Sequence, residues 1–203
     1  MGRSVVDWPI GAVTVYKPEK CYNGFTLVAQ RGIWSLIDMK GRIVHSWRTR
    51  ILERLADGNY IGFSETAVKE VNWDDEVLWS YTSRGVERFH HDVQKLKNGN
   101  YILLSNEPVE APEISKIKLK DDHLTEVTPN KKIVWEWWAH QHFDEFELTD
   151  EAKKIIYETG GGEVGAIPTR PGLFIGDWCH TNTVHALPEN PLYKQGDLSL
   201  IHI

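Results

Sequence analysis

Histidines gather in two short motifs that could carry chemistry. His90 and His91 are adjacent and precede Asp92, and His180 lies two residues before Asn182. In an extended strand, residues two apart point to the same face, so the His180 imidazole and the Asn182 amide would share one side. An imidazole can act as an acid, a base or a nucleophile near neutral pH. Together with a guanidinium, such groups suit the binding of a tetrahedral oxyanion.

The spacing of leucines indicates how these groups could meet. Arg50, His91 and Asn182 each lie five residues before a leucine. If the three stretches are innermost strands of neighbouring units in a ring, their side chains converge on an axial pocket. Two ordinary interpretations remain open at this point. A His-His pair can simply be the polar start of a strand, and His180 alone can be a structural histidine.

The elements that would position these groups are repeated in the sequence. An apolar strand, a polar turn and a second strand ending on an aromatic residue occur three times without a gap, at 36–47, 70–81 and 126–137. A second cassette, Leu-x-x-Gly-Asn-Tyr-Ile with Asp or Asn before the glycine, occurs at 55–61 and 96–102, 41 residues apart. That period matches a four-stranded propeller blade. A β-sandwich would also show short strands and regular turns, but not copies that align without gaps.

We therefore predict an all-β fold, a partial β-propeller of about three four-stranded blades. The single domain covers 1–197, with blades at about 13–47, 48–138 and 177–197 and an insertion at 139–176. The insertion carries one short helix, capped by Thr149 and ended by the glycines from Gly160.

Three finer expectations concern the loops and the last strand. The dipeptides Asp57-Gly58 and Asn98-Gly99 predict type I′ hairpin turns, since that turn needs positive φ at both central residues. Residues 106–122 are expected to leave the sheet as a long loop. Residues 179–187 are expected to form the innermost strand of the next blade.

Composition excludes several classes of function. The formal charge is −6, the isoelectric point is near 5.8 and no basic run occurs, which argues against a nucleic-acid partner. No stretch approaches the roughly 18 apolar residues of a membrane span, and no signal peptide is evident at the N-terminus. Cys21 and Cys179 lack the flanking residues of a redox or zinc motif, and His140 with His142 fits a loop surface better than a metal site. No cofactor and no metal is expected, and the compartment stays open.

The final six residues, 198–203, resemble the translated end of a sequencing adapter. We expect them to be an artefact that ends a truncated gene product, although an ordinary alternating strand would look similar. They are therefore left out of functional reasoning.

Several segments together resemble the arylsulfotransferase propeller family. The opening at 14–27, the cassette at 36–47, the motif His90-His91-Asp92-Val93 with the following Leu-Lys-Asn-Gly-Asn, and the segment 177–184 are similar to successive hallmarks of that family in the same order. The resemblance covers roughly residues 13–190. The strand and turn cassettes occur in other propellers as well, whereas the two histidine motifs are much more specific.

The resemblance implies a six-bladed enzyme that moves a sulfuryl group from a phenolic sulfate ester to a phenol, without a nucleotide donor and through a sulfated histidine. It implies catalytic roles for His180 and His91 and a substrate contact from His90. The leucine spacing adds Asn182 and Arg50 as expected substrate contacts. The family's later arginine and sulfuryl-accepting histidine would lie beyond residue 190, so this chain is expected to be inactive by itself. A homodimer is a further expectation for the full-length protein.

Two other functions remain open. The chain could belong to a propeller that binds a ligand or a protein without catalysis. It could also belong to a metal-dependent hydrolase or lyase that uses His90, His91 and His180.

Overall fold

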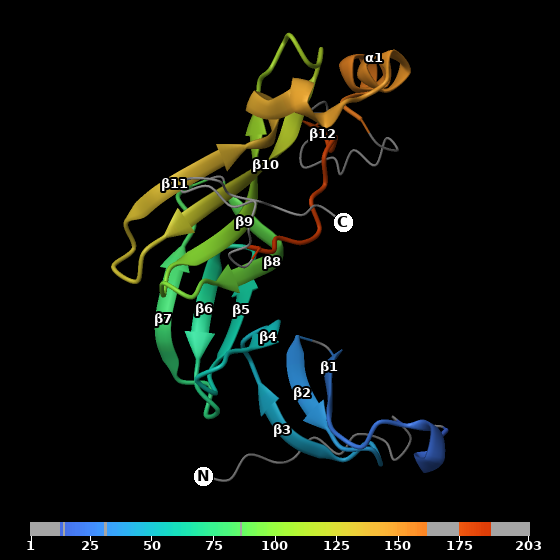
Figure 1. Cartoon of the computed structure of the whole chain (residues 1–203), viewed down its shortest axis with the longest axis vertical. Coiled ribbons are helices and arrows are strands. Elements are labelled where there is room, and N and C mark those ends of the chain that lie inside the picture. Colours follow the sequence, from blue (N-terminus) through green and yellow to red (C-terminus); the bar gives the residue numbers. More distant parts are fainter. Residues whose placement is uncertain (1–12, 14, 31, 86, 162–174, 188–203) are drawn as a thin grey trace.

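The strands of this chain form three separate antiparallel sheets that follow one another along the sequence (Figure 1). The computed structural model describes residues 13, 15–30, 32–85, 87–161 and 175–187. The predicted all-β class is confirmed, and three open sheets in sequence order are consistent with a partial propeller. The number of blades in a complete ring stays a prediction.

Strands that are consecutive in the chain pair with each other in every sheet, with the exception of β12 (Ile175–Gly176). The first sheet contains β1 (Thr26–Gln30), β2 (Ile33–Ile37) and β3 (Ile43–Trp47). The second contains β4 (Glu53–Arg54), β5 (Tyr60–Ser64), β6 (Ala67–Val71) and β7 (Val77–Thr82). The third contains β8 (Arg88–Lys95), β9 (Tyr101–Val109), β10 (Lys118–Val127) and β11 (Ile133–Trp138), with β12 (Ile175–Gly176) added parallel to β10.

The helical elements lie outside the three sheets. They are the short 3-10 segments η1 (Pro18–Lys20) and η2 (Ala139–Phe146) and the helix α1 (Asp150–Thr159). The predicted caps of α1 are confirmed: the Thr149 hydroxyl accepts from the Ala152 amide at 3.2 Å, and Gly160 follows the helix with φ +78°. Gly160 also packs against Gly176 of β12 so closely that a Cβ on either glycine would overlap the other backbone.

One turn geometry joins the last two strands of each sheet. The first residue of the turn, Asp38, Asn72 or Thr128, accepts one or more backbone N–H groups of its own turn through a side-chain oxygen. This local bonding explains why Asp, Asn and Thr stand at that position of the three cassettes. The fourth residue of each turn has positive φ; these residues are Gly41, Asp75 and Lys131.

The predicted type I′ turns are wrong. In the turn that joins β4 and β5, the Gly58 amide donates to the Leu55 carbonyl at 3.0 Å, and Gly58 alone among the turn residues has positive φ. The equivalent bond from Gly99 to Leu96 is also 3.0 Å. Each glycine therefore follows a type I turn as the left-handed residue of a longer hairpin loop, which uses one positive φ instead of two.

The predicted loop at 106–122 is also largely wrong. Strands β9 and β10 continue as a hairpin, with Val109 opposite Leu119, so the excursion shrinks to residues 110–117. Pro108 is tolerated because β8 pairs with β9 only as far as Asn106, which leaves that side of β9 without a strand partner.

Apolar faces of neighbouring sheets pack against each other. One core joins the second and third sheets through residues such as Ile61, Phe63, Phe89 and Leu103, all at most 3% exposed. A second core centres on Trp47 and joins the first and second sheets. Sheets packed face to face in this way form a stiff support for the residues at their edges.

Parts of several predictions fall outside the described residues. They are the N-terminal residues 1–12, the insertion residues 162–174, the end of the expected blade at 188–197 and the suspected adapter segment 198–203. Among the helices that the structure does describe, none has the length and apolarity to cross a bilayer.

Gly62 of β5 is the glycine at which the packing of the sheets leaves least room for a side chain. A Cβ on Gly62 would lie 1.5 Å from the carbonyl oxygen of Arg50. We expect Gly62→Ala to lower the free energy of unfolding by about 3 kcal/mol or more, since backbone must move to relieve the overlap. Urea unfolding measures the change. Gly24→Ala, where nothing lies within 4 Å, is the matched control; equal stability of the two variants would contradict the packing described.

Candidate active site

A bulge in β8 presents the first histidine motif. Phe89 pairs with Ser105 and Val93 pairs with Leu103, so three residues of β8 stand opposite one residue of β9. His91, inside this bulge, has φ +54°. A bulge of this kind bends the strand and redirects its side chains, and bulges are frequent beside functional sites.

The second histidine motif lies along β8, held there by side chains rather than by a strand ladder (Figure 1). The Asp92 carboxylate accepts from the Thr183 hydroxyl at 2.7 Å and from the Val184 amide at 2.9 Å. The Gln94 side-chain oxygen accepts from the Ala186 amide at 2.7 Å. Because side chains take up these amides, the predicted strand at 179–187 is wrong: that stretch contains a single bridge, at residue 186.

These two supports bring the imidazoles together. The Nε2 atoms of His91 and His180 are 3.1 Å apart, and the ring centroids are 5.1 Å apart. Like His91, His180 has a left-handed backbone, with φ +51°. The sequence-based expectation that His91 and His180 converge therefore agrees with the structure, while their catalytic role stays a prediction.

A carboxylate and an ammonium group orient the His180 ring. Asp177 Oδ2 lies 2.7 Å from His180 Nδ1 and accepts a bond of 2.8 Å from Lys120 Nζ. A carboxylate at Nδ1 fixes the proton on that nitrogen and supports an imidazolium. The Nε2 atom of His180 is then left to face His91 and the space beside it.

His90 sits deeper, next to the carboxylate of Asp122. His90 Nε2 is 3.1 Å from Asp122 Oδ1, a close ion-pair distance without the angles of a hydrogen bond. The other Asp122 oxygen accepts from the Thr181 amide. Burial raises the pKa of Asp122, but the contacts with His90 and Thr181 outweigh burial and hold that pKa below its ordinary value. Asp122 therefore stays ionised and ties β10 to the residue after His180.

The pKa of the His91 imidazole lies below its ordinary value. Burial lowers the pKa of His91, and the neighbouring positive charges of His90, His180, Lys120 and Arg50 lower it further. A neutral His91 can accept a proton or hydrogen bond at Nε2 from its partner. The surrounding cations favour an anionic ligand.

Arg50 and Asn182, the other two predicted contact residues, bond to or pack on neighbouring protein groups. The Arg50 guanidinium lies over the Phe63 ring, 4.4 Å from its centroid, and 5.8 Å from the centroid of Trp34. The Asn182 side chain is exposed and donates to the His180 carbonyl at 3.1 Å. The leucine spacing paired Asn182 with His91, but it is His180 that meets His91 in the structure.

Three comparisons place the chain among known proteins. A protein-family model described as Arylsulfotransferase (ASST) matches residues 13–193. The chain belongs to the arylsulfotransferase family. No match was found among curated proteins. A crystal structure of a protein of unknown function from Bacteroides caccae is 13% identical, with a TM-score of 0.39, and the match covers 57% of this chain and 40% of that one.

Sequence reasoning missed the carboxylates that build this candidate site. A signal for two of them was present in the histidine motifs, because Asp92 directly follows His91 and Asp177 lies three residues before His180. Asp122 and Lys120 gave a weaker signal, as charges in a segment that was expected to be a loop. Their strand assignment depends on pairing with β9, which is a long-range contact.

Asp92 is the residue on which docking of the second motif depends most. We expect Asp92→Asn to weaken the bonds to Thr183 and Val184, because an amide carries no charge and one of its two heavy atoms can only donate. Hydrogen exchange of the 181–187 amides should then accelerate about tenfold or more. Asp57→Asn, in an exposed turn where the carboxylate accepts the Asn59 amide, is the control; unchanged exchange in Asp92→Asn would contradict the docking role.

The titration of His91 tests the charges around it. We expect an NMR midpoint below the ordinary 6.5, and a rise toward that value in Lys120→Gln, which removes one positive neighbour. Since the folded state holds this proton less tightly than the unfolded chain, stability should be full above pH 6.5 and fall as the pH drops through and below that value. The exposed Lys97→Gln should leave the midpoint unchanged. A midpoint at or above 6.5 in the parent would contradict this environment.

Proposed function

We propose that this chain supplies part of the active site of an arylsulfate sulfotransferase, which moves a sulfuryl group from a phenolic sulfate ester to a phenol. The observation that carries the proposal is the 3.1 Å contact between His91 and His180 in a family member, with Asp177 and Lys120 behind the second ring.

The charges of the site suit a sulfate ester. Burial lowers the pKa of His91, and the nearby positive charges of His90, His180, Lys120 and Arg50 lower it further. A sulfate monoester carries one negative charge, which these positive charges attract. Sulfuryl transfer parallels phosphoryl transfer, in which positioning and cationic donors supply most of the catalysis.

His180 is proposed as the acid for the departing phenol. Asp177 holds a proton on Nδ1 and supports the imidazolium, so Nε2–H can donate to the ester oxygen. As the donor S–O bond breaks, that proton passes to the phenolate oxygen and the sulfuryl group forms an S–N bond to a second histidine. In the return half-reaction the S–N bond breaks, the acceptor phenol oxygen takes the sulfuryl group, and its proton returns to His180.

His91 and His90 are proposed as partners in binding. A neutral His91 accepts from His180 Nε2–H in the empty site and can then turn toward a sulfate oxygen as a donor. The Asp122 carboxylate beside His90 supports a proton on that ring. Arg50 is proposed to act on the substrate through its positive charge, which also lowers the pKa of His91. Asn182 is proposed to hold the backbone at His180, since its side chain donates to the His180 carbonyl.

The resemblance places the sulfuryl-accepting histidine beyond residue 190, and none of the residues 1–203 matches it. We therefore expect these residues alone to bind a phenolic sulfate without turning it over. A possible homodimer of the full-length protein stays a prediction.

The decisive measurement is turnover of 4-nitrophenyl sulfate with phenol as acceptor, in a gene product that also carries the downstream motifs. We expect His180→Asn to lower kcat by about 10²–10⁴-fold and to remove the basic limb of the pH–rate profile, since that limb reports loss of the acid's proton. His185→Asn, an exposed histidine of the same segment, is the control.

Each other outcome has a defined meaning. An unchanged basic limb in His180→Asn would overturn the acid role. Release of nitrophenol that does not depend on the acceptor would indicate hydrolysis, and saturable binding with no release would support a ligand-binding propeller. Release by residues 1–203 alone would contradict the assignment of the accepting histidine.

A further inference from the structure

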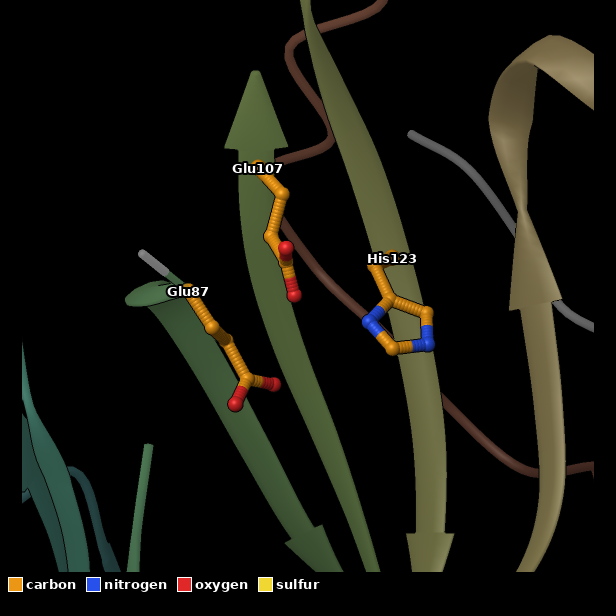
Figure 2. A group of neighbouring side chains, drawn as sticks. All are labelled: Glu87, Glu107 and His123. Carbon is orange, nitrogen blue, oxygen red and sulfur yellow. The ribbon is translucent and has the colours of Figure 1, made fainter. Parts of the chain in front are cut away.

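A second cluster of titratable side chains lies at the start of β8 and shares no residue with the His91–His180 contact. Glu87 precedes β8, Glu107 lies on β9 and His123 lies on β10. One oxygen or nitrogen atom from each residue lies within 4.8 Å of the others, and among the described residues this is the group that meets that condition (Figure 2).

Two of the three side chains are buried, Glu107 is partly exposed, and one imidazole nitrogen lacks a hydrogen-bond partner among the described residues. Glu87 and His123 are each 1% exposed, and His123 Nδ1 has no hydrogen-bond partner among the described residues. Figure 2 shows that nitrogen on the side of the ring that faces the two glutamates. An imidazole nitrogen aimed at two carboxylates, without a donor or acceptor of its own, leaves a lone pair free for a ligand bond.

The opposite side of the His123 ring is held in place. Nε2 lies 3.2 Å from the Thr125 hydroxyl and 3.3 Å from Glu136 Oε1, and the Trp138 ring stacks on the imidazole at 3.8 Å between centroids. A carboxylate on the second nitrogen is the usual outer support of a metal-binding histidine, because it fixes the tautomer and raises the basicity of the ligating nitrogen.

The glutamates are arranged as ligands would be. Glu87 accepts one bond at each oxygen, from the Ser105 hydroxyl and the Arg84 amide, so its carboxylate is oriented and still has free lone pairs. Burial raises the pKa of Glu107, and the neighbouring Glu87 carboxylate raises it further.

We propose that Glu87, Glu107 and His123 Nδ1 bind a divalent first-row transition cation of the Zn²⁺ type, with water completing the shell. One imidazole with carboxylates suits these ions, whereas Ca²⁺ and Mg²⁺ prefer oxygen ligands throughout. Bound ligand atoms are about 3.4 Å apart around tetrahedral zinc, so the group must close by on the order of 1 Å, within reach of glutamate rotation.

Such an ion would link the start of β8 to β9 and β10. These strands also carry the bulge at His90 and His91 and the Asp122 carboxylate, which is next to His123 in sequence. The ion would therefore act on the first site by fixing its strands, and it takes no part in sulfuryl transfer.

Calorimetric titration of the metal-stripped 203-residue chain with ZnCl₂ tests the proposal. We expect one ion per chain, and at least about tenfold weaker binding in His123→Gln and in Glu107→Gln. His142→Gln is the matched control, since His142 is also paired with a glutamate, at 2.7 Å, but on the surface; it should bind as the parent does. Absence of binding in the parent, or parent-like binding in both ligand variants, would overturn the proposal.

A second measurement keeps the test decisive if a ligand variant fails to fold. X-ray absorption of the Co²⁺-loaded parent chain should show one imidazole and mainly oxygen ligands. Two or more imidazoles would assign the ion to the cluster of His90, His91 and His180 and reject the site proposed here. Both readouts are independent of sulfotransferase activity, so the two proposals can fail separately.

Discussion

The Asp92 carboxylate is the contact on which the geometry of the site depends most. It accepts the Val93 amide within its own strand through one oxygen and holds Thr183 and Val184 through the other. One side chain thus fixes both the exit of the β8 bulge and the path of the segment that carries His180. Charge-assisted bonds of this kind are stronger than neutral ones, and a partly buried carboxylate makes their loss costly.

The sheets make that contact possible because they hold β8 rigidly from both faces. The core between the second and third sheets buries Phe89 and Val93, the two residues that flank the bulge. On the other face, Val184 of the docked segment packs with Ile102, Leu104 and Leu124. Apolar packing therefore sets the position of the bulge and of the docked segment, and polar side chains set their register.

Local sequence signals predicted most of the strands and the helix. The two segments that they predicted wrongly, 106–122 and 179–187, take their structure from contacts with residues that are distant in sequence. The turns that begin at Asp38, Asn72 and Thr128 lie inside the three repeated cassettes, and Thr149 with Gly160 bounds α1. The extension of β9 through Pro108 depends on which neighbours lie beside it, which local patterns do not contain. The same holds for 179–187, whose amides bond to side chains of Asp122, Asp92 and Gln94 that are distant in sequence.

The candidate site divides in the same way. The histidines could be found from their motifs, but the roles of the carboxylates that orient them needed the fold.

The backbone conformation of the two histidines is a further argument that their arrangement is functional. Both His91 and His180 have positive φ, a conformation that costs a residue with a Cβ about 1 kcal/mol or more. A polar strand end would not need that cost, since ordinary extended backbone leaves a histidine in solvent. Two left-handed histidines nevertheless meet at 3.1 Å, where Asp177 bonds the His180 ring and Asp92 bonds the Val93 amide at the exit of the bulge that carries His91.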